Sequence, residues 1–224
     1  MPDRASIFSL SSINPIVRLF IVSDFFIVGG LGLVSPIFAL FVTDFIEGAT
    51  IEVVGIAMTI YLVTRSIGQL PVGIVIDRIC GQRDDMLILI FSSLGFAGIS
   101  ISYIFIDTVL QLYLVQFVFG LLGAASYPTW SAIFTRAIDE GKEGFEWSMY
   151  QTIADLGAAL TAAIGSFIAE AYGFTIVFIL MAIFSLMGSM LLIWSGKILL
   201  GEKPKEGRKI VGAPRKRDTA GGGL

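Results

Sequence analysis

Long apolar stretches separated by short polar connections make up most of this sequence. A helix needs about 20 mostly apolar residues to cross a bilayer, and six segments meet that requirement. The pattern therefore predicts an all-α membrane protein with six transmembrane helices, at Ile16–Val42, Val53–Ile76, Met86–Ile106, Leu110–Phe134, Ser148–Ala171 and Phe174–Ile198. The connections are short, and only 135–147 is long enough to form a loop of its own.

The same pattern divides the chain into three parts. Residues 1–14 form an N-terminal segment, residues 15–198 form the six-helix domain, and residues 199–224 form a tail rich in Lys, Arg, Gly and Pro. The tail has few large apolar residues with which to build a core, so we expect it to be disordered. Its basic residues serve either to attract anionic lipid or as a solvated orientation signal.

The composition supports a membrane protein and excludes several kinds of site. The mean hydropathy is +0.86, and 15% of the residues are charged, against about a quarter in a typical soluble domain. The chain has no histidine and a single cysteine, Cys80. Disulfide bonds, metal sites built on Cys and His, and histidine-containing triads are therefore excluded. We expect no cofactor and no bound metal.

The distribution of basic residues predicts an orientation. Fourteen of the 15 Lys and Arg residues lie near the two termini or in the second and fourth connections, and the other three connections have none. Connections rich in Lys and Arg stay in the cytoplasm. Both termini are therefore predicted to be cytoplasmic, in a multi-pass protein of the plasma membrane.

Three ionisable residues lie deep inside the expected spans: Asp24, Arg65 and Asp155. A charged side chain at the centre of a membrane helix costs about 2.5–3.5 kcal/mol, so each of these residues is a candidate for function. Counted from the cytoplasmic ends, their depths agree within about 6 Å. The three side chains can therefore meet if their helices face one another. One arginine against two acids leaves one acid free to move a proton, or leaves the arginine free to exchange an acid for an anionic ligand.

Polar and small residues recur at helical spacing beside these charges. Residues four apart share one face of a helix, and such stripes face protein rather than lipid. The stripes are Tyr61, Arg65 and Gln69; Gln116, Gly120, Gly123 and Tyr127; and Asp155, Ala159, Ala162 and Ser166. One interpretation is close packing with a salt bridge that fixes the register. The other is a substrate or proton pathway formed by Asp24, Arg65, Asp155, Tyr61, Gln69 and Gln116.

The second connection lies within the sequence PVGIVIDRICGQRDD, residues 71–85. A glycine, an aspartate four residues later with a basic residue after it, and a second glycine with further basic charge resemble the signature loop of the major facilitator superfamily. Gly73, Asp77, Arg78, Gly81 and Arg83 stand in these roles, with one residue more than the usual pattern. The segment 120–128 is also similar to the end of that family's fourth helix, although Gln116 stands where the family often has an arginine.

The resemblance implies a major-facilitator-like half bundle, because the family's usual member has twelve helices in two halves of six, each built as 3+3 inverted repeats. It also implies that Gly73, Asp77, Arg78, Gly81 and Arg83 form a conformational latch, which joins one half to the other and helps to set which side of the membrane is open. The alternative is a plain turn whose arginines only set the orientation.

The function that the resemblance implies is secondary active transport of a small solute by alternating access, with a second six-helix unit supplied by a homodimer or by another transporter half. The alternative is a non-transporting membrane scaffold or partner subunit. An enzyme is not expected, because the chain lacks histidine and the motifs HExxH and GxSxG. The expected partners are the lipid bilayer, a small-molecule substrate and the second half, without nucleic acid.

Overall fold

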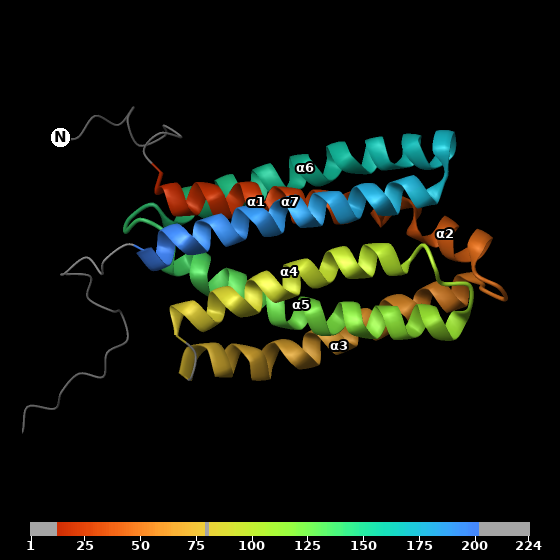
Figure 1. Cartoon of the computed structure of the whole chain (residues 1–224), viewed down its shortest axis with the longest axis horizontal. Helices are drawn as coiled ribbons and strands as arrows, with labels where there is room; N and C mark the ends of the chain where they lie inside the picture. The colour runs from red at the N-terminus through yellow and green to blue at the C-terminus, as the bar shows by residue number, and fades with distance from the viewer. Residues whose placement is uncertain (1–12, 79–80, 202–224) are drawn as a thin grey trace, which may run out of the picture.

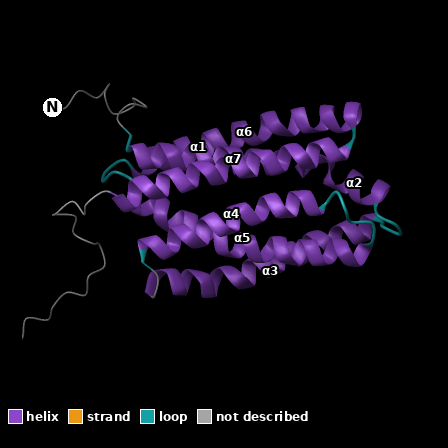
Figure 2. Cartoon of the chain, in the orientation of Figure 1, coloured by secondary structure: helices purple, strands orange, loops and turns teal. Residues whose placement is uncertain are grey.

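The computed structural model describes residues 13–78 and 81–201, and every regular element in these ranges is a helix (Figures 1 and 2). The elements are α1 (Pro15–Val34), the short 3₁₀ helix η3 (Ser35–Ile37), α2 (Phe38–Phe45), α3 (Ile51–Arg78), α4 (Gln82–Ser102), α5 (Val109–Ala137), α6 (Glu143–Tyr172) and α7 (Phe174–Gly201). Among the described residues, α1 to α2 form one span and α3 to α7 form five more, each long and apolar enough to cross a membrane. The prediction of six spans is confirmed.

The sequence pattern suggested that the first span is one continuous helix, but in the structure the span is interrupted. Helix α1 ends at Val34, and the 3₁₀ turn contains Pro36, which has no backbone N–H to continue an α-helix. The remaining eight residues of the span form α2, whose Phe41 packs on Phe178 of α7 with ring centroids 4.7 Å apart. A count of apolar residues does not detect this break, because the residues around the proline are themselves apolar.

The loop expected over 135–147 is much shorter in the structure. Helix α5 continues to Ala137 and α6 begins at Glu143, so only residues 138–142 connect them. The first turn of α6 carries Glu143 and Glu146, and acidic side chains are favourable at a helix N-terminus. Polar helical turns of this kind fall outside a search for apolar segments. Residues 1–12 and 202–224, with most of the two terminal segments, lie outside the described residues.

Four helices form the centre of the bundle, and two flank it (Figure 1). Helix α1 packs on α7, α7 on α4 and α4 on α5, while α5 touches α1 lightly. Helix α6 lies against α1, and α3 lies against α5. We call the face formed by α6, α1, α5 and α3 the inner face, and α4 and α7 lie behind it.

The main contacts follow a regular rule. The five largest helix–helix contacts all join one of the first three spans to one of the last three: α1 to α6, α1 to α7, α3 to α5, α4 to α5 and α4 to α7. If each of the first three spans is exchanged for its counterpart in the last three, this set of contacts maps onto itself. The short connection at Gly173, with φ of 85°, joins α6 to α7 by a single residue outside the helices.

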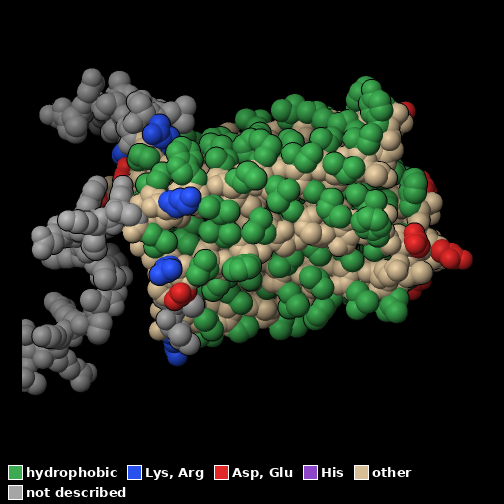
Figure 3. Space-filling view, in the orientation of Figure 1, with side chains coloured by type: hydrophobic (Ala, Val, Ile, Leu, Met, Phe, Trp, Pro, Cys, Tyr) green, Lys and Arg blue, Asp and Glu red, His purple; other side chains and the backbone are tan. Residues whose placement is uncertain are grey.

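The charged residues gather at the two ends of the bundle, and apolar side chains cover the surface between them (Figure 3). The visible Lys and Arg side chains lie, with some acidic ones, at the end where α1 begins and α7 ends. The charged side chains that are visible at the opposite end are acidic. At that acidic end, the backbone N–H of Glu47 donates to the carbonyl oxygen of Asp107 at 2.9 Å, which ties two connections together. Such an arrangement suits a bundle that crosses a bilayer along its helices.

Candidate functional site

Arg65 lies near the middle of α3, on the side that meets α5. Its Nη1 donates to the hydroxyl of Tyr61, one turn away, at 3.1 Å. Its guanidinium carbon lies 5.2 Å from the centre of the Tyr127 ring on α5, a cation–π distance. Its Nε is buried and has no hydrogen-bond partner. The arginine is therefore held by tyrosines and not by a carboxylate.

Glycines let α3 and α5 approach closely enough to place Arg65. A Cβ at Gly120 would lie 2.8 Å from the carbonyl oxygen of Tyr61, and one at Gly68 would lie 2.7 Å from Ala124. Next to this crossing, the aliphatic stem of Arg65 lies over Gly123, where a Cβ would be 3.3 Å from its Cδ. Gly120 and Gly123 therefore serve packing between helices, and the packing fixes the position of the arginine.

Asp24 lies on α1 and is bound by a residue that the sequence did not single out. The hydroxyl of Tyr150, on α6, donates to Oδ2 of Asp24 at 2.8 Å. The ring of Tyr150 lies 4.5 Å from that of Trp130, in an aromatic cluster of α5 and α6 that also includes Phe134 and Trp147. Packing in this cluster fixes the position of the Tyr150 ring, and the hydrogen bond from its hydroxyl fixes the position of the Asp24 carboxylate.

Asp155 lies on α6 with an exposed side chain, and its Oδ1 accepts from Nε2 of Gln151, one turn earlier, at 2.9 Å. In the described part of the chain, ion pairs involve only Arg136 and Lys142 as cations. The expectation that Asp24, Arg65 and Asp155 meet directly is therefore not met. Counting residues along each helix predicts similar depths, but it does not predict the lateral separation between α3 and α6.

Two tyrosines nevertheless contact two of the three charged residues on the inner face. Tyr127 lies against Arg65 on one side. Tyr127 and Asp155 both lie within electrostatic reach of Tyr150, which holds Asp24. The polar groups of α3, α5, α6 and α1 therefore stand on one face of the bundle, with Tyr127 beside the arginine and Tyr150 beside Asp24. We call this region the inner polar cluster.

The two candidate glutamines occupy different places. Gln69 is half-buried on α3, one turn beyond Arg65 toward the end with the termini. Gln116 is buried in α5, with 1% of its surface exposed, and its Oε1 has no hydrogen-bond partner. Gln69 therefore lies beside the inner polar cluster, whereas Gln116 is enclosed by helices of the bundle.

The signature loop carries an ion-pair chain at the end with the termini. Nη1 of Arg136, at the end of α5, lies 2.6 Å from Oδ2 of Asp85, whose side chain is fully buried in the first turn of α4. Nη2 of the same arginine lies 3.9 Å from Oδ1 of the exposed Asp77, at the end of α3. One guanidinium therefore connects three helices, with a strong partner in Asp85 and a weak one in Asp77.

The other residues of this loop are exposed. Gly81 precedes α4. Its backbone N–H donates to Oδ2 of Asp84 in a long hydrogen bond of 3.5 Å at the N-terminus of the helix. Arg78 and Arg83 point to solvent, and Cys80 lies outside the described residues. A Cβ at Gly73 would meet nothing within 4 Å, so no close neighbour of α3 is present at that point in the described chain.

Sequence reasoning missed Tyr150, Asp85 and Arg136. In the sequence, Arg136 contributes only to the distribution of basic residues, and Asp85 is only the last residue of the stretch 71–85. The spacing of Asp85 within the first turn of α4, on the same side as the buried Met86 and Leu89, is a signal that could have marked it as buried. Tyr150 has no comparable signal, because tyrosine is common near membrane interfaces.

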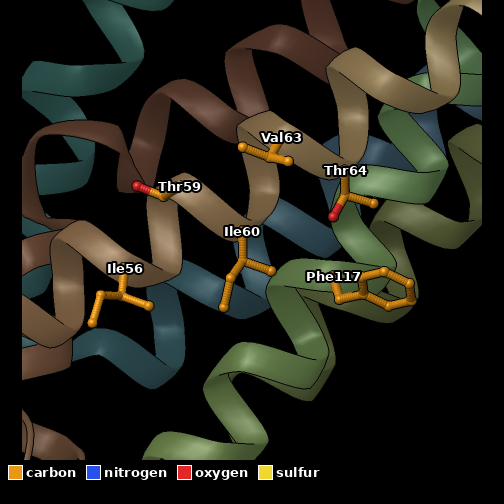
Figure 4. A pocket seen from close by; sticks show the side chains of 6 residues that line it. All are labelled: Ile56, Thr59, Ile60, Val63, Thr64 and Phe117. Carbon is orange, nitrogen blue, oxygen red and sulfur yellow. The ribbon is translucent and has the colours of Figure 1, made fainter.

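Two open grooves flank these polar groups, and both are largely apolar. One lies between α3 and α5, and Figure 4 shows the six side chains that line it: Ile56, Thr59, Ile60, Val63, Thr64 and Phe117. Helical spacing places Arg65 on another side of α3, so this groove does not contain the charge. The other groove lies between α1 and α6 and is lined partly by small residues, including Gly32, Ala158 and Ala162.

Six membrane-length helices, with a charged cluster on one lateral face and an ion-pair chain at one end, define a multi-pass membrane protein of transporter type. The Major Facilitator Superfamily model matches residues 8–219, and the chain belongs to this family. An uncharacterized MFS-type transporter from Methanocaldococcus jannaschii is 26% identical over 145 residues, which cover 64% of this chain and 36% of that protein.

A solved structure has the same fold. The POT family transporter PepTSo superposes with a TM-score of 0.70 at 14% sequence identity, over 82% of this chain and 38% of that one. The chain therefore spans well under half the length of the relatives that it matches. Its family is that of transporters, not of enzymes.

Proposed function

We propose that this chain is one six-helix unit of a secondary active transporter, which moves a small solute across the plasma membrane by alternating access. Family membership supports transport in general. The observation that carries the proposal for this chain is the inner polar cluster: Asp24, Arg65 and Asp155 lie on the inner face within helices of membrane length. Ionisable groups are expensive at such positions and mark substrate or ion pathways.

A second six-helix unit would complete the pathway. The inner face exposes Asp155 and part of Arg65, which lipid tails cannot solvate. In helix α3, only Ala57 and Ile76 are buried, so most of its surface is available to a neighbour. Transporters of this fold pair two halves about an axis along the membrane normal, with the substrate site between them. We propose a second copy of the chain, or another half, as the cover.

Three further features fit this proposal. The mapping of contacts between the first and last three spans supports an origin from 3+3 inverted repeats. The basic residues at the end with the termini support cytoplasmic termini, and a reporter fused after Leu224 that was active only outside the cytoplasm would contradict that orientation. The chain Asp77–Arg136–Asp85 supports a latch that joins α3, α4 and α5 in one state of the transport cycle.

The deciding experiment is transport by purified protein in liposomes. A panel of labelled sugars, amino acids, organic acids and organic cations would be tested with and without a proton gradient. We expect saturable uptake of one class of solute, and loss of that uptake in Asp155→Asn. Because Asp155 is exposed, this variant should fold like the parent protein, so lost uptake would not reflect unfolding.

The alternative is a membrane scaffold or partner subunit that does not transport. The exposed inner face is the observation in its favour, since a helix from another membrane protein could also cover it. Protein that folds, forms a defined complex and takes up no member of the solute panel would favour this function over transport.

A further inference from the structure

The charge of Arg65 is not compensated by any group in the described chain. No carboxylate lies within ion-pair distance of its guanidinium, and its hydrogen bond and its ring contact are both with neutral tyrosines. The residue stands about 20 Å from either end of α3, too far to reach lipid phosphates. A guanidinium does not lose its proton in a protein. A full positive charge is therefore held inside the membrane without a counterion.

Neighbouring groups fix the position of the guanidinium but do not neutralise its charge. The stem lies over Gly123, the guanidinium faces the half-exposed ring of Tyr127, and Nη1 is fixed by Tyr61. Tyr61 is itself stacked on Phe119, with ring centroids 4.6 Å apart and planes 25° apart. Each of these contacts orients the guanidinium, and none neutralises it. Nε is buried without a partner, and among the described residues only Nη1 makes a hydrogen bond, so Nη2 remains as a donor.

We propose that Arg65 is the binding site for the carboxylate of a small organic monoanion, which is the substrate class of the proposed transporter. The planar fork of a guanidinium matches a carboxylate in two parallel hydrogen bonds. A single arginine balances a single negative charge, and Asp24 and Asp155 on the same face would repel a polyanion. The ring of Tyr127 and the apolar residues around it offer a surface for an apolar or aromatic body.

This inference rests on the proposed function, but it can be tested by binding alone. Purified full-length protein would be titrated with benzoate and octanoate, and with their neutral amides as matched controls, while thermal unfolding is followed by intrinsic fluorescence. We expect at least one carboxylate to raise the melting temperature saturably and its amide to have little effect. Arg65→Gln should weaken that binding about tenfold or more, since it removes hydrogen bonds to a charged group.

Two other variants separate the binding role from folding. Arg78→Gln removes an exposed arginine from the end of the same helix and should leave carboxylate binding unchanged. Arg65→Lys keeps the charge without the planar fork and should bind with intermediate affinity. Because the charge of Arg65 has no counterion, Arg65→Gln should fold at least as well as the parent protein. A loss of folding in Arg65→Gln that Arg65→Lys restores would instead show a structural ion pair, and would overturn the proposal.

Other outcomes would also overturn it: equal shifts with acids and amides, no shift with any carboxylate, or full binding in Arg65→Gln. The anion site and the transport function can fail separately. If carboxylate binding depends on Arg65 but no solute is taken up into liposomes, the anion site is supported and the transport function is contradicted. If the Arg65→Gln variant takes up a neutral solute at the parent rate, the transport function is supported and the anion site is contradicted.

Discussion

Single hydroxyl groups set the geometry of the inner polar cluster. Tyr150 joins α6 to α1 through its hydrogen bond to Asp24, and Tyr61 fixes Arg65 within α3. In both cases a rigid aromatic ring places the hydroxyl, because Tyr150 packs on Trp130 and Tyr61 on Phe119. Hydrogen bonds between membrane helices contribute about 0.6 kcal/mol on average and up to about 1.7 kcal/mol. These hydrogen bonds therefore serve more to position the side chains of Asp24 and Arg65 than to stabilise the fold.

Tyr150→Phe tests this difference. The ring and its packing remain, but the donor to Asp24 is lost. We expect a loss of stability of about 1 kcal/mol, measured by thermal or denaturant unfolding in detergent, and a changed pH dependence of uptake if Asp24 carries a proton. The matched control is Tyr172→Phe, at the exposed end of the same helix. Equal stability and equal pH profiles for the two variants would show that the bond to Asp24 has no role.

At the scale of helices, close crossings decide which side chains can meet. A Cβ at Gly165 of α6 would overlap the backbone carbonyl group of Leu33 in α1, so α1 and α6 are in backbone contact there. The crossing of α3 and α5 at Gly68 and Gly120 is similarly tight. Backbone contacts of this kind give membrane helices much of their packing energy. They also fix the frame in which Asp24 and Arg65 stand.

Gly165→Ala should therefore separate α1 from α6. The added methyl group meets backbone atoms, which cannot rotate away, and overpacking of this kind costs about 1–3 kcal/mol. Gly98→Ala on α4 is the control, because a Cβ there meets nothing within 4 Å and alanine favours the helix by about 0.5–1 kcal/mol. Unfolding of both purified variants would be compared. A Gly165→Ala protein as stable as Gly98→Ala would contradict the close contact.

The two acids that share Arg136 should respond differently to substitution. Arg136→Gln leaves the buried Asp85 without its partner, at a cost of about 1–3 kcal/mol, and Asp85→Asn in that background should restore stability. Asp77 is exposed and 3.9 Å from the arginine, so Asp77→Asn should change stability by less than about 1 kcal/mol. If the loop is a latch, Asp77→Asn should nevertheless lower transport while abundance holds. If the Asp77→Asn variant transports normally, the loop serves only to set the orientation of the protein in the membrane.

At the scale of the whole molecule, the sequence predicted the number of spans and the family, because apolar length and short motifs are local properties. It did not predict the partners of Asp24 or Arg65. Those depend on which helices are neighbours: α3 packs on α5 and α6 on α1, so the arginine stands on one flank, Asp155 stands on the other, and Asp24 stands on a central helix. Depth along a helix can be counted, but lateral order in the bundle cannot.

The lateral order also predicts how two units fit together. A twofold axis along the membrane normal turns one inner face onto another, and it brings α3 of one unit beside α6 of the second. Both helices present exposed residues on the side that would face the second unit, such as Met58 on α3, two turns from Arg65 on the same side of the helix, and Ala163 on α6. Both positions lie about 30 Å along their helices from the end with the termini. They should therefore lie at the same level in the membrane.

Cysteine cross-linking can test this arrangement directly. The native Cys80 would first be replaced by serine, and Met58→Cys and Ala163→Cys would be placed on separately tagged copies and co-expressed. Because the two positions share a level and face each other across the axis, oxidation in native membranes should give a disulfide-linked product that carries both tags. Phe91→Cys and Met190→Cys, exposed on α4 and α7 behind the inner face, should give little product. A disulfide link between position 58 and a different protein would identify another half as the partner. Equal yields for the two pairs, or monomers alone with no partner, would contradict a second unit on the inner face. In that case Arg65 and Asp155 would face lipid without cover, which the cost of charge in a bilayer opposes.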